Sequence, residues 1–181
     1  PDGGNLSAIL FRLEQEDHKR YDLICRQIAR VLPVFDRFKI EESYGKVLLR
    51  WKAKGADKTF GAHLTSDGSL RFFALVTLLN LPKEMLPNVI LLDEPELGLH
   101  PKAVVLIGNM INRVSRKVQT LVATQSPLLV DQFDVNEITV LDHVEGYTEC
   151  YKLKLEEYQH WLEDDFSVGD LWLKNVIGGR P

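Results

Sequence analysis

The stretch Asn88-Val89-Ile90-Leu91-Leu92-Asp93-Glu94-Pro95 decides the fold of this chain. Its four apolar residues stand between turn formers and are too few for a helix, so they predict a strand buried on both faces of a parallel sheet. Two adjacent carboxylates follow at the carboxyl end of this strand, where open α/β sheets bind ligands. Because neighbouring carboxylates repel and are costly to desolvate, a metal ion or a phosphate-bound water is a natural reason for them. The simpler alternative is a core strand that enters an acidic turn.

A second segment, Thr65-Ser66-Asp67-Gly68-Ser69-Leu70-Arg71, precedes an apolar run over 72–79. Ser66 or Asp67 can cap the predicted helix, and Gly68 allows the backbone to approach a ligand closely. Free N–H groups, a hydroxyl and the positive end of the helix dipole together make an anion site. The alternative is an ordinary capped and buried helix.

A third segment, Thr120-Leu121-Val122-Ala123-Thr124-Gln125-Ser126-Pro127, predicts another buried strand that ends in polar residues. Its Ser-Pro pair is typical of the start of a helix. The carboxyl ends of two strands therefore carry the candidate polar side chains.

Taken in order, these segments resemble the ATPase head of the ABC superfamily, and especially the RecF/SMC-like soluble ATPases of the AAA type. Residues 66–69 resemble the signature loop in its S-D-G form, with Thr65 where leucine is usual. Residues 89–94 resemble Walker B with its following glutamate. Residues 96–101 resemble the D-loop region, and 123–127 the switch segment. The tail, 171–181, also resembles the ending of such proteins, so the resemblance spans nearly the whole chain.

The resemblance implies roles for these residues. Asp93 would hold Mg²⁺ through water, and Glu94 would orient or deprotonate the water that attacks the γ-phosphate of ATP. The loop Ser66, Asp67, Gly68 and Ser69 would bind ATP held by the opposite subunit, with Ser66 and Gly68 on its γ-phosphate, so a complete site needs a homodimer of heads.

Three further residues have specific expectations. Asp67 should cap its helix, because its charge beside a phosphate is unfavourable. Gln125 stands where many relatives carry a histidine that touches the γ-phosphate, and it keeps a hydrogen-bond donor but loses proton exchange, which leaves slower hydrolysis open. His100 is expected to be structural.

The sequence lacks a P-loop, which needs G-x-x-x-x-G-K-[ST] to cradle phosphates and hold magnesium. Its one Gly-Lys pair, Gly45-Lys46, precedes Val47 and has Ile40 at the place of the first glycine. The expected fold class is therefore α/β, the C-terminal half of a P-loop NTPase of the ABC head type. By itself this half is expected to be inactive as an ATPase. A natural truncation that does not bind nucleotide in the usual way is the alternative.

The chain pattern predicts three parts: a helical and hairpin lobe over 1–62, the ATPase core half over 63–155, and a helical tail over 156–181. Apolar stripes at helical spacing include Leu6 to Leu13 and Tyr21 to Val31, and a β-hairpin flanks Tyr44-Gly45. Strands near 89–92, 120–124 and 138–142 alternate with helices near 102–117 and 127–133, which favours a parallel sheet with crossover helices. An antiparallel edge follows near 149–155.

Composition agrees with one core. The chain has 181 residues, 45% of them hydrophobic, and a net charge of −4. No apolar run reaches the roughly 18 residues of a membrane span, so we expect a cytoplasmic protein without a membrane partner. Cys25 and Cys150 lack metal spacing and are expected to be reduced, although a disulfide between them stays open.

Two function classes remain. The first is an ATP-driven dimerisation switch in DNA repair, phage defence or a similar process, with DNA or another protein as a candidate partner. The second is a catalytically inactive interaction module derived from such an ATPase. Basic residues cluster around the hairpin, where a solvated face explains them and nucleic acid is the alternative: Lys46, Arg50, Lys52, Lys54 and Lys58.

Overall fold

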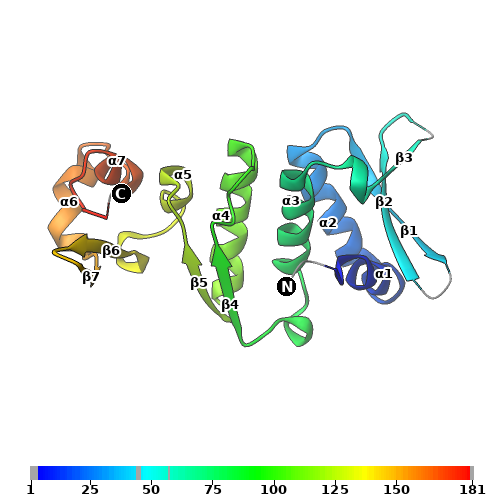
Figure 1. Ribbon diagram of the computed structural model, residues 1–181, viewed down its shortest axis with the longest axis horizontal. Helices are drawn as coiled ribbons and strands as arrows, with labels where there is room; N and C mark the ends of the chain where they lie inside the picture. The colour runs from blue at the N-terminus through cyan, green and yellow to red at the C-terminus, as the bar shows by residue number, and fades with distance from the viewer. Residues whose placement is uncertain (1–3, 44–45, 57, 180–181) are drawn as a thin grey trace. The chain divides into compact units, whose positions relative to one another are not determined.

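The computed structural model describes residues 4–43, 46–56 and 58–179. The chain forms two compact units, the first made of residues 1–91 and 97–121, the second of 92–96 and 122–181. The three-part division at 62 and 155 stays a prediction. Figure 1 shows the elements of both units along the chain.

The first unit begins with two helices, α1 (Leu6–Glu16) and α2 (His18–Val31). Asp17 ends α1 and caps α2, because its carboxylate accepts a hydrogen bond from the Arg20 amide at 3.2 Å. The predicted apolar stripes form the buried faces of both helices: Leu6, Leu10 and Leu13 on α1, and Tyr21, Ile24 and Ile28 on α2.

The predicted hairpin is confirmed by an antiparallel sheet of β1 (Phe35–Ser43), β2 (Lys46–Ala53) and β3 (Thr59–Gly61). The turn residues Tyr44 and Gly45 lie outside the described residues. The pairing of β1 with β2 shifts register between Phe35 and Arg37, so Phe35 and Phe38 are both buried. Helices α1 and α2 contact this sheet.

An aromatic cluster fills the space between this sheet and α3 (Asp67–Leu78), which follows the short helix η1 (Ala62–Leu64). Phe73 of α3 lies 5.4 Å from Phe35 and 5.2 Å from Phe38 between ring centroids. Trp51 of β2 stacks on Phe60 of β3 at 4.8 Å. Such offset and edge-to-face pairs add to the stabilisation from burial.

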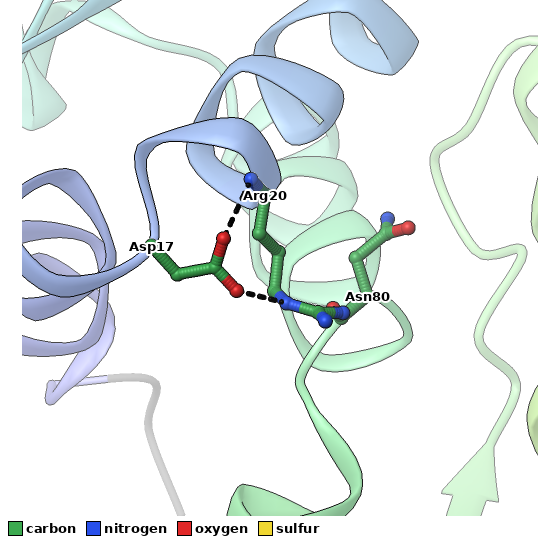
Figure 2. A network of polar contacts seen from close by, with 3 residues as sticks. All are labelled: Asp17, Arg20 and Asn80. Atoms are coloured by element: carbon green, nitrogen blue, oxygen red, sulfur yellow. Dashed lines mark hydrogen bonds and ion pairs between the residues drawn. The ribbon is translucent and has the colours of Figure 1, made fainter.

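Asn80, which follows α3, joins three helices through hydrogen bonds. Its side-chain amide donates to Gln27 of α2 at 2.8 Å, and its side-chain oxygen accepts from Arg113 of α4 (Pro101–Ser115) at 2.8 Å. Arg20 donates to its backbone carbonyl at 2.7 Å, and Figure 2 shows Arg20 between Asp17 and Asn80. Because Asn80 and Gln27 are buried, these bonds satisfy groups that would otherwise destabilise the core.

We expect Asp17→Asn to destabilise the protein at neutral pH and to lose this effect in acid. The hydrogen bond from the Arg20 side chain, 2.8 Å long, holds the pKa of Asp17 below its ordinary value. A depressed carboxyl pKa contributes stability above the unfolded-state pKa, and this contribution is lost as the pH falls through the lower folded-state pKa. In thermal melts from pH 7 down to about pH 3, the melting temperatures of the two proteins should therefore converge as the carboxyl protonates.

The control for this prediction is Asp22→Asn, on the same helix, whose carboxylate makes a 3.7 Å contact with His18. It should shift the melting temperature less at neutral pH. An Asp17→Asn difference that stays constant across the pH range would contradict the role of the carboxylate.

After the short helix η2 (Lys83–Met85), β4 (Val89–Asp93) pairs with β5 (Gln119–Ala123) in a two-stranded parallel sheet connected through α4 (Figure 1). The predicted strand is present, but the expectation that it is buried on both faces is wrong. Ile90 is buried, whereas Val89 is 46% exposed, Leu91 71% and Leu121 66%. The reason is that described elements of the chain cover only one face of this sheet.

The second unit contains α5 (Pro127–Val130), the short helix η3 (Val135–Glu137), β6 (Thr139–Val144), β7 (Tyr147–Lys152), α6 (Leu155–Glu163) and α7 (Val168–Leu173). Helix α5 is shorter than the predicted 127–133. Within the described residues β6 pairs antiparallel with β7 in a separate sheet and not with β4 or β5, so the expectation that the 138–142 strand continues the parallel sheet is wrong. Apolar residues of these elements and of the segments that follow β7 and α7 form a core: Val135, Val140, Leu153, Val168, Leu171 and Ile177.

Both cysteines are free thiols, as expected: Cys25 is buried and Cys150 is exposed. Burial raises the pKa of Cys25. Among the described residues, no helix combines the length and the apolar character that crossing a membrane requires.

Candidate functional site

The signature segment lies in the first unit, at the start of α3. Ser66 is the N-cap: its hydroxyl accepts a hydrogen bond from the Ser69 amide at 3.3 Å and lies 2.9 Å from the Ser69 hydroxyl. The expectation that Asp67 caps the helix is wrong. Asp67 is the first helical residue, where an acidic side chain is favourable beside the positive end of the helix dipole. Ser66 and Asp67 are exposed, and Gly68 and Ser69 are half-buried.

Thr65, the departure from the usual leucine, has a structural role. Its hydroxyl accepts a hydrogen bond from the Trp51 indole at 2.9 Å and donates to the Gly61 carbonyl at 3.1 Å. The residue before the cap is therefore tied to β2 and to the end of β3. A leucine would make neither bond and would leave the indole N–H without this partner.

Gly68 is required by a neighbouring backbone rather than only by a ligand. A Cβ added at Gly68 would overlap the carbonyl of Gly98, and Gly98 itself has a left-handed φ of +76°. Arg71, one turn further along α3, donates to the Leu97 carbonyl at 3.3 Å. The start of α3 therefore packs directly on the 97–98 backbone, a contact that sequence reasoning missed, because the spacing between the two glycines carries no periodic signal.

In the second unit, the carboxylates Asp93 and Glu94 end β4. Asp93 is exposed and Glu94 is half-buried. Glu94 has a φ of +41°, in the left-handed region that non-glycine residues rarely adopt. Its amide donates to the Ala123 carbonyl at the end of β5, at 2.9 Å. Residues held in this region cluster at functional sites, since the surroundings must offset the conformational cost.

A polar network links the turn after β4 with the segment after β5. The Thr124 hydroxyl donates to Glu96 Oε1 at 2.5 Å and accepts from the Ser126 amide at 3.0 Å. Glu96 Oε2 is buried and has no hydrogen-bond partner among the described residues. Ser126 in turn caps α5 by accepting from the Leu129 amide at 3.3 Å, as its Ser-Pro pair predicts.

Gln125 lies between two residues of this network, and its side chain is exposed. The structure thus brings the segments of Glu94 and Gln125 together within one unit. Sequence reasoning placed both at strand ends but missed Glu96 and Thr124. A signal was available in the sequence. Glu96 follows the first strand by three residues and Thr124 directly follows the second, so both are polar groups at the same edge of the sheet.

His100 has the structural role expected for it. Its Nδ1 accepts a hydrogen bond from the Lys102 amide at 3.2 Å, so it caps α4, whose first residue is Pro101. Ser126 and His100 therefore start helices in the same way, each followed by a proline at the first helical position.

The carboxylate that ends β4 is compatible with a hydrated magnesium ion. The described residues contain no group of three or more His, Cys, Asp or Glu side chains that could hold a metal ion. Mg²⁺ keeps several waters and takes one or two carboxylates together with substrate phosphates. Asp93, an exposed carboxylate at the end of β4, has the chemistry that this mode of binding requires.

The sequence matches one family model over residues 3–131, the family described as "AAA domain, putative AbiEii toxin, Type IV TA system". A comparison with curated proteins gave no match.

Among solved structures, a chain described under "ATP-driven dimerization and DNA stimulated activation of SMC ATPases" is similar, with a TM-score of 0.57 and 19% identity over 81% of this chain and 93% of that one. The Smc head with an extended coiled coil from Pyrococcus furiosus, bound to the C-terminal domain of ScpA, gives a TM-score of 0.63 and 19% identity, covering 82% of this chain and 38% of that one. An SmcHead bound to the C-winged helix domain of ScpA gives 0.60 and 18%, covering 87% and 50%.

This chain spans half or less of the two ScpA-bound heads that it matches. At these identities the likeness shows the fold, which is α/β and of the SMC ATPase-head type. The fold class predicted from the sequence is therefore confirmed.

Proposed function

Because the chain belongs to this AAA-domain family, we propose that it supplies the signature, Walker B and switch segments of an ATP-hydrolysing head that pairs around ATP. The observation that carries the proposal is the junction of the two strand ends. Glu94 is held in a left-handed conformation, and hydrogen bonds tie its segment to the one that contains Gln125. A strained acidic residue at this edge of a sheet favours a chemical role over a purely structural one.

Glu94 is proposed as the general base or water-positioning residue. Its carboxylate is half-buried at the strand end, and a glutamate there can accept a proton from water as the water attacks the γ-phosphate. Gln125 acts from the neighbouring strand end through its side-chain amide, which donates a hydrogen bond but does not exchange a proton.

Asp93 is proposed to hold Mg²⁺ through water, and Mg²⁺ when bound would neutralise charge on the ATP phosphates. The carboxylate needs no second protein ligand for this, since the nucleotide supplies the remaining oxygens. Asp93 is exposed, which leaves its carboxylate accessible to a hydrated ion.

The signature residues Ser66, Asp67, Gly68 and Ser69 are proposed to bind ATP held by a second head. The positive end of the dipole of a twelve-residue helix, with the Ser66 and Ser69 hydroxyls beside it, attracts phosphate. The P-loop that the composite site requires would come from a segment outside residues 1–181. The chain is proposed to act in the cytoplasm.

A nucleic acid is a candidate partner. One face of the β1–β2 pair places like charges directly opposite each other, Arg37 with Lys52 and Lys39 with Arg50. Such pairs destabilise a sheet, and a polyanion would relieve the repulsion. Glu41 lies 3.5 Å from Lys39 and 3.8 Å from Arg50, which offsets part of it.

We expect Ser66→Arg to abolish ATP-dependent pairing while leaving ATP binding by each head nearly unchanged. The measurement needs the protein that carries a P-loop together with this chain, assayed by size-exclusion chromatography with and without ATP. The guanidinium would fill the space between the start of α3 and the γ-phosphate. Mixing this variant with a P-loop lysine variant should restore partial pairing, because one of the two sites then combines an intact P-loop with an intact signature.

Ser66→Ala is the control, because it removes the cap at a cost of about 1 kcal/mol without adding bulk. It should pair far better than Ser66→Arg. If Ser66→Arg pairs with ATP as well as the unaltered protein does, Ser66 only caps a helix and the proposed role in the opposite subunit's site is wrong.

A further inference from the structure

Glu96 connects the two strand ends at which the proposed chemistry takes place. Its Oε1 accepts the Thr124 hydroxyl at 2.5 Å, and Thr124 accepts the Ser126 amide at 3.0 Å. We call this pair of residues the Glu96–Thr124 latch. A hydrogen bond to a carboxylate is about twice as strong as one between neutral groups, so the latch is a strong side-chain link between these two segments.

The latch lies beside a backbone bond between the same segments. The Glu94 amide donates to the Ala123 carbonyl at 2.9 Å. Glu94 and Glu96 thus engage consecutive residues, Ala123 and Thr124, while the buried Pro95 between them restricts the turn. A movement of Glu94 away from the end of β5 breaks its own bond to Ala123, and the bond from Thr124 to Glu96 opposes the movement.

Gln125 gains its orientation from the same contacts. Its exposed side chain is not packed in the core, so the backbone on either side decides where it points. That backbone is fixed by Thr124, which bonds Glu96, and by Ser126, which bonds Thr124 and caps α5. Without the Thr124 hydroxyl, the Ser126 amide loses its acceptor and the 124–126 segment is free to change conformation.

The energetics argue that Glu96 is present for more than stability. A hydrogen bond to a charged group stabilises a fold, whereas a buried polar atom left unpaired destabilises it by a comparable amount. Glu96 has one bond of the first kind, and its Oε2 is buried without a partner among the described residues. The unpaired oxygen opposes the stabilisation from the bond to Thr124, so the partly buried carboxylate is not explained by folding stability alone.

We propose that Glu96 is a positioning residue that acts through Thr124 to fix Gln125 relative to Glu94. The proposal deepens the proposed ATPase function and rests on it for its catalytic consequence. In the unaltered protein the candidate base and the switch glutamine, which belong to two different strand ends, are held in one geometry. Loss of the latch leaves both residues present but not aligned, so the rate of the chemical step falls while nucleotide affinity does not.

The first test is amide hydrogen exchange, measured residue by residue by NMR on this chain. Thr124→Val, which keeps the shape but removes the hydroxyl, and Glu96→Ala should each speed exchange of the Glu94 and Ser126 amides on the order of 10-fold. Exchange in the α2 core should be unchanged. Glu96→Gln retains an acceptor oxygen for Thr124 and should restore slow exchange.

The matched control is Thr120→Val, in β5, the strand that Thr124 follows, where the hydroxyl donates to the Val118 carbonyl at 3.2 Å. It should leave the exchange rates of the Glu94 and Ser126 amides unchanged. If exchange rises throughout the chain in the latch variants, the pair only stabilises the fold and the proposal is overturned. Unchanged exchange at both amides overturns it as well.

The second test is steady-state ATP hydrolysis by the protein that carries a P-loop together with this chain. Glu96→Ala should lower kcat on the order of 10-fold with KM for ATP unchanged, and the double variant with Gln125→Ala should be no slower than Glu96→Ala alone. Normal kcat in Glu96→Ala, alongside slow hydrolysis in Glu94→Gln, overturns the proposal and leaves the proposed function intact. Normal hydrolysis in Glu94→Gln overturns the proposed function, and hydrogen exchange alone then decides whether the latch fixes these segments.

Discussion

Glu94→Gln is expected to slow ATP hydrolysis by on the order of 10²-fold or more and to make ATP-bound dimers persist. Glutamine keeps the size of the side chain and its hydrogen bonding but cannot accept the proton of the attacking water. It also adopts the left-handed conformation at φ +41° no less readily than glutamate, so the turn should be unchanged. Turnover and size-exclusion chromatography with ATP measure both effects in the protein that carries a P-loop.

The control for this variant is Glu84→Gln in η2, an exposed glutamate outside the site, which should hydrolyse ATP normally. Asp93→Asn should give a different result: magnesium should be held less well at the site, and ATP-bound dimers should not accumulate. Normal turnover in Glu94→Gln would place the base elsewhere. If in addition no ATP-dependent dimer forms in any variant, the results favour the alternative function, a catalytically inactive interaction module.

Phe73→Ala should lower the free energy of unfolding by about 3–5 kcal/mol, the usual cost of truncating a buried phenylalanine. The ring is fully buried and lies at the centre of the aromatic cluster, in contact with Phe35, Phe38 and Trp51. Its removal leaves a cavity between α3 and the β1–β2–β3 sheet. Denaturant unfolding followed by circular dichroism measures the change, and Trp51 fluorescence should respond.

Leu64→Ala is the control for this effect, since Leu64 is 64% exposed and lies just before α3. It should change the free energy of unfolding by about 0.5 kcal/mol or less. A Phe73→Ala protein as stable as the unaltered one would mean that the aromatic cluster does not stabilise the first unit.

The elements of the fold were predictable where one local pattern dominates. The stripe Leu6 to Leu13 has helical spacing, and the 89–92 run is too short and apolar to be anything but a strand. Burial was not predictable for the same strand, because a hydrophobic run shows only that burial of its side chains would be favourable. Whether Leu91 is covered depends on which elements lie over the sheet. Tertiary packing likewise decides that, among the described residues, β6 pairs only with β7.

The candidate site was predictable residue by residue but not contact by contact. Ser66 and Asp67 are equally good caps by type, and the backbone of Ser66, extended at ψ 151°, decides between them. The approach of Gly98 to Gly68 and the bond from Thr124 to Glu96 join segments that are distant in sequence. Such contacts arise from the geometry of packed elements, and the residue types on either side do not determine them.

The exposed face of the β4–β5 sheet has a consequence for how the protein behaves at high concentration. Val89, Leu91 and Leu121 are exposed apolar residues of these two strands, which among the described residues pair only with each other. Sheets with an apolar face and open edges promote association and aggregation. We therefore expect light scattering by the purified chain to rise with protein concentration and with added sulfate. Such self-association requires no nucleotide and would form the baseline above which ATP-dependent pairs are counted.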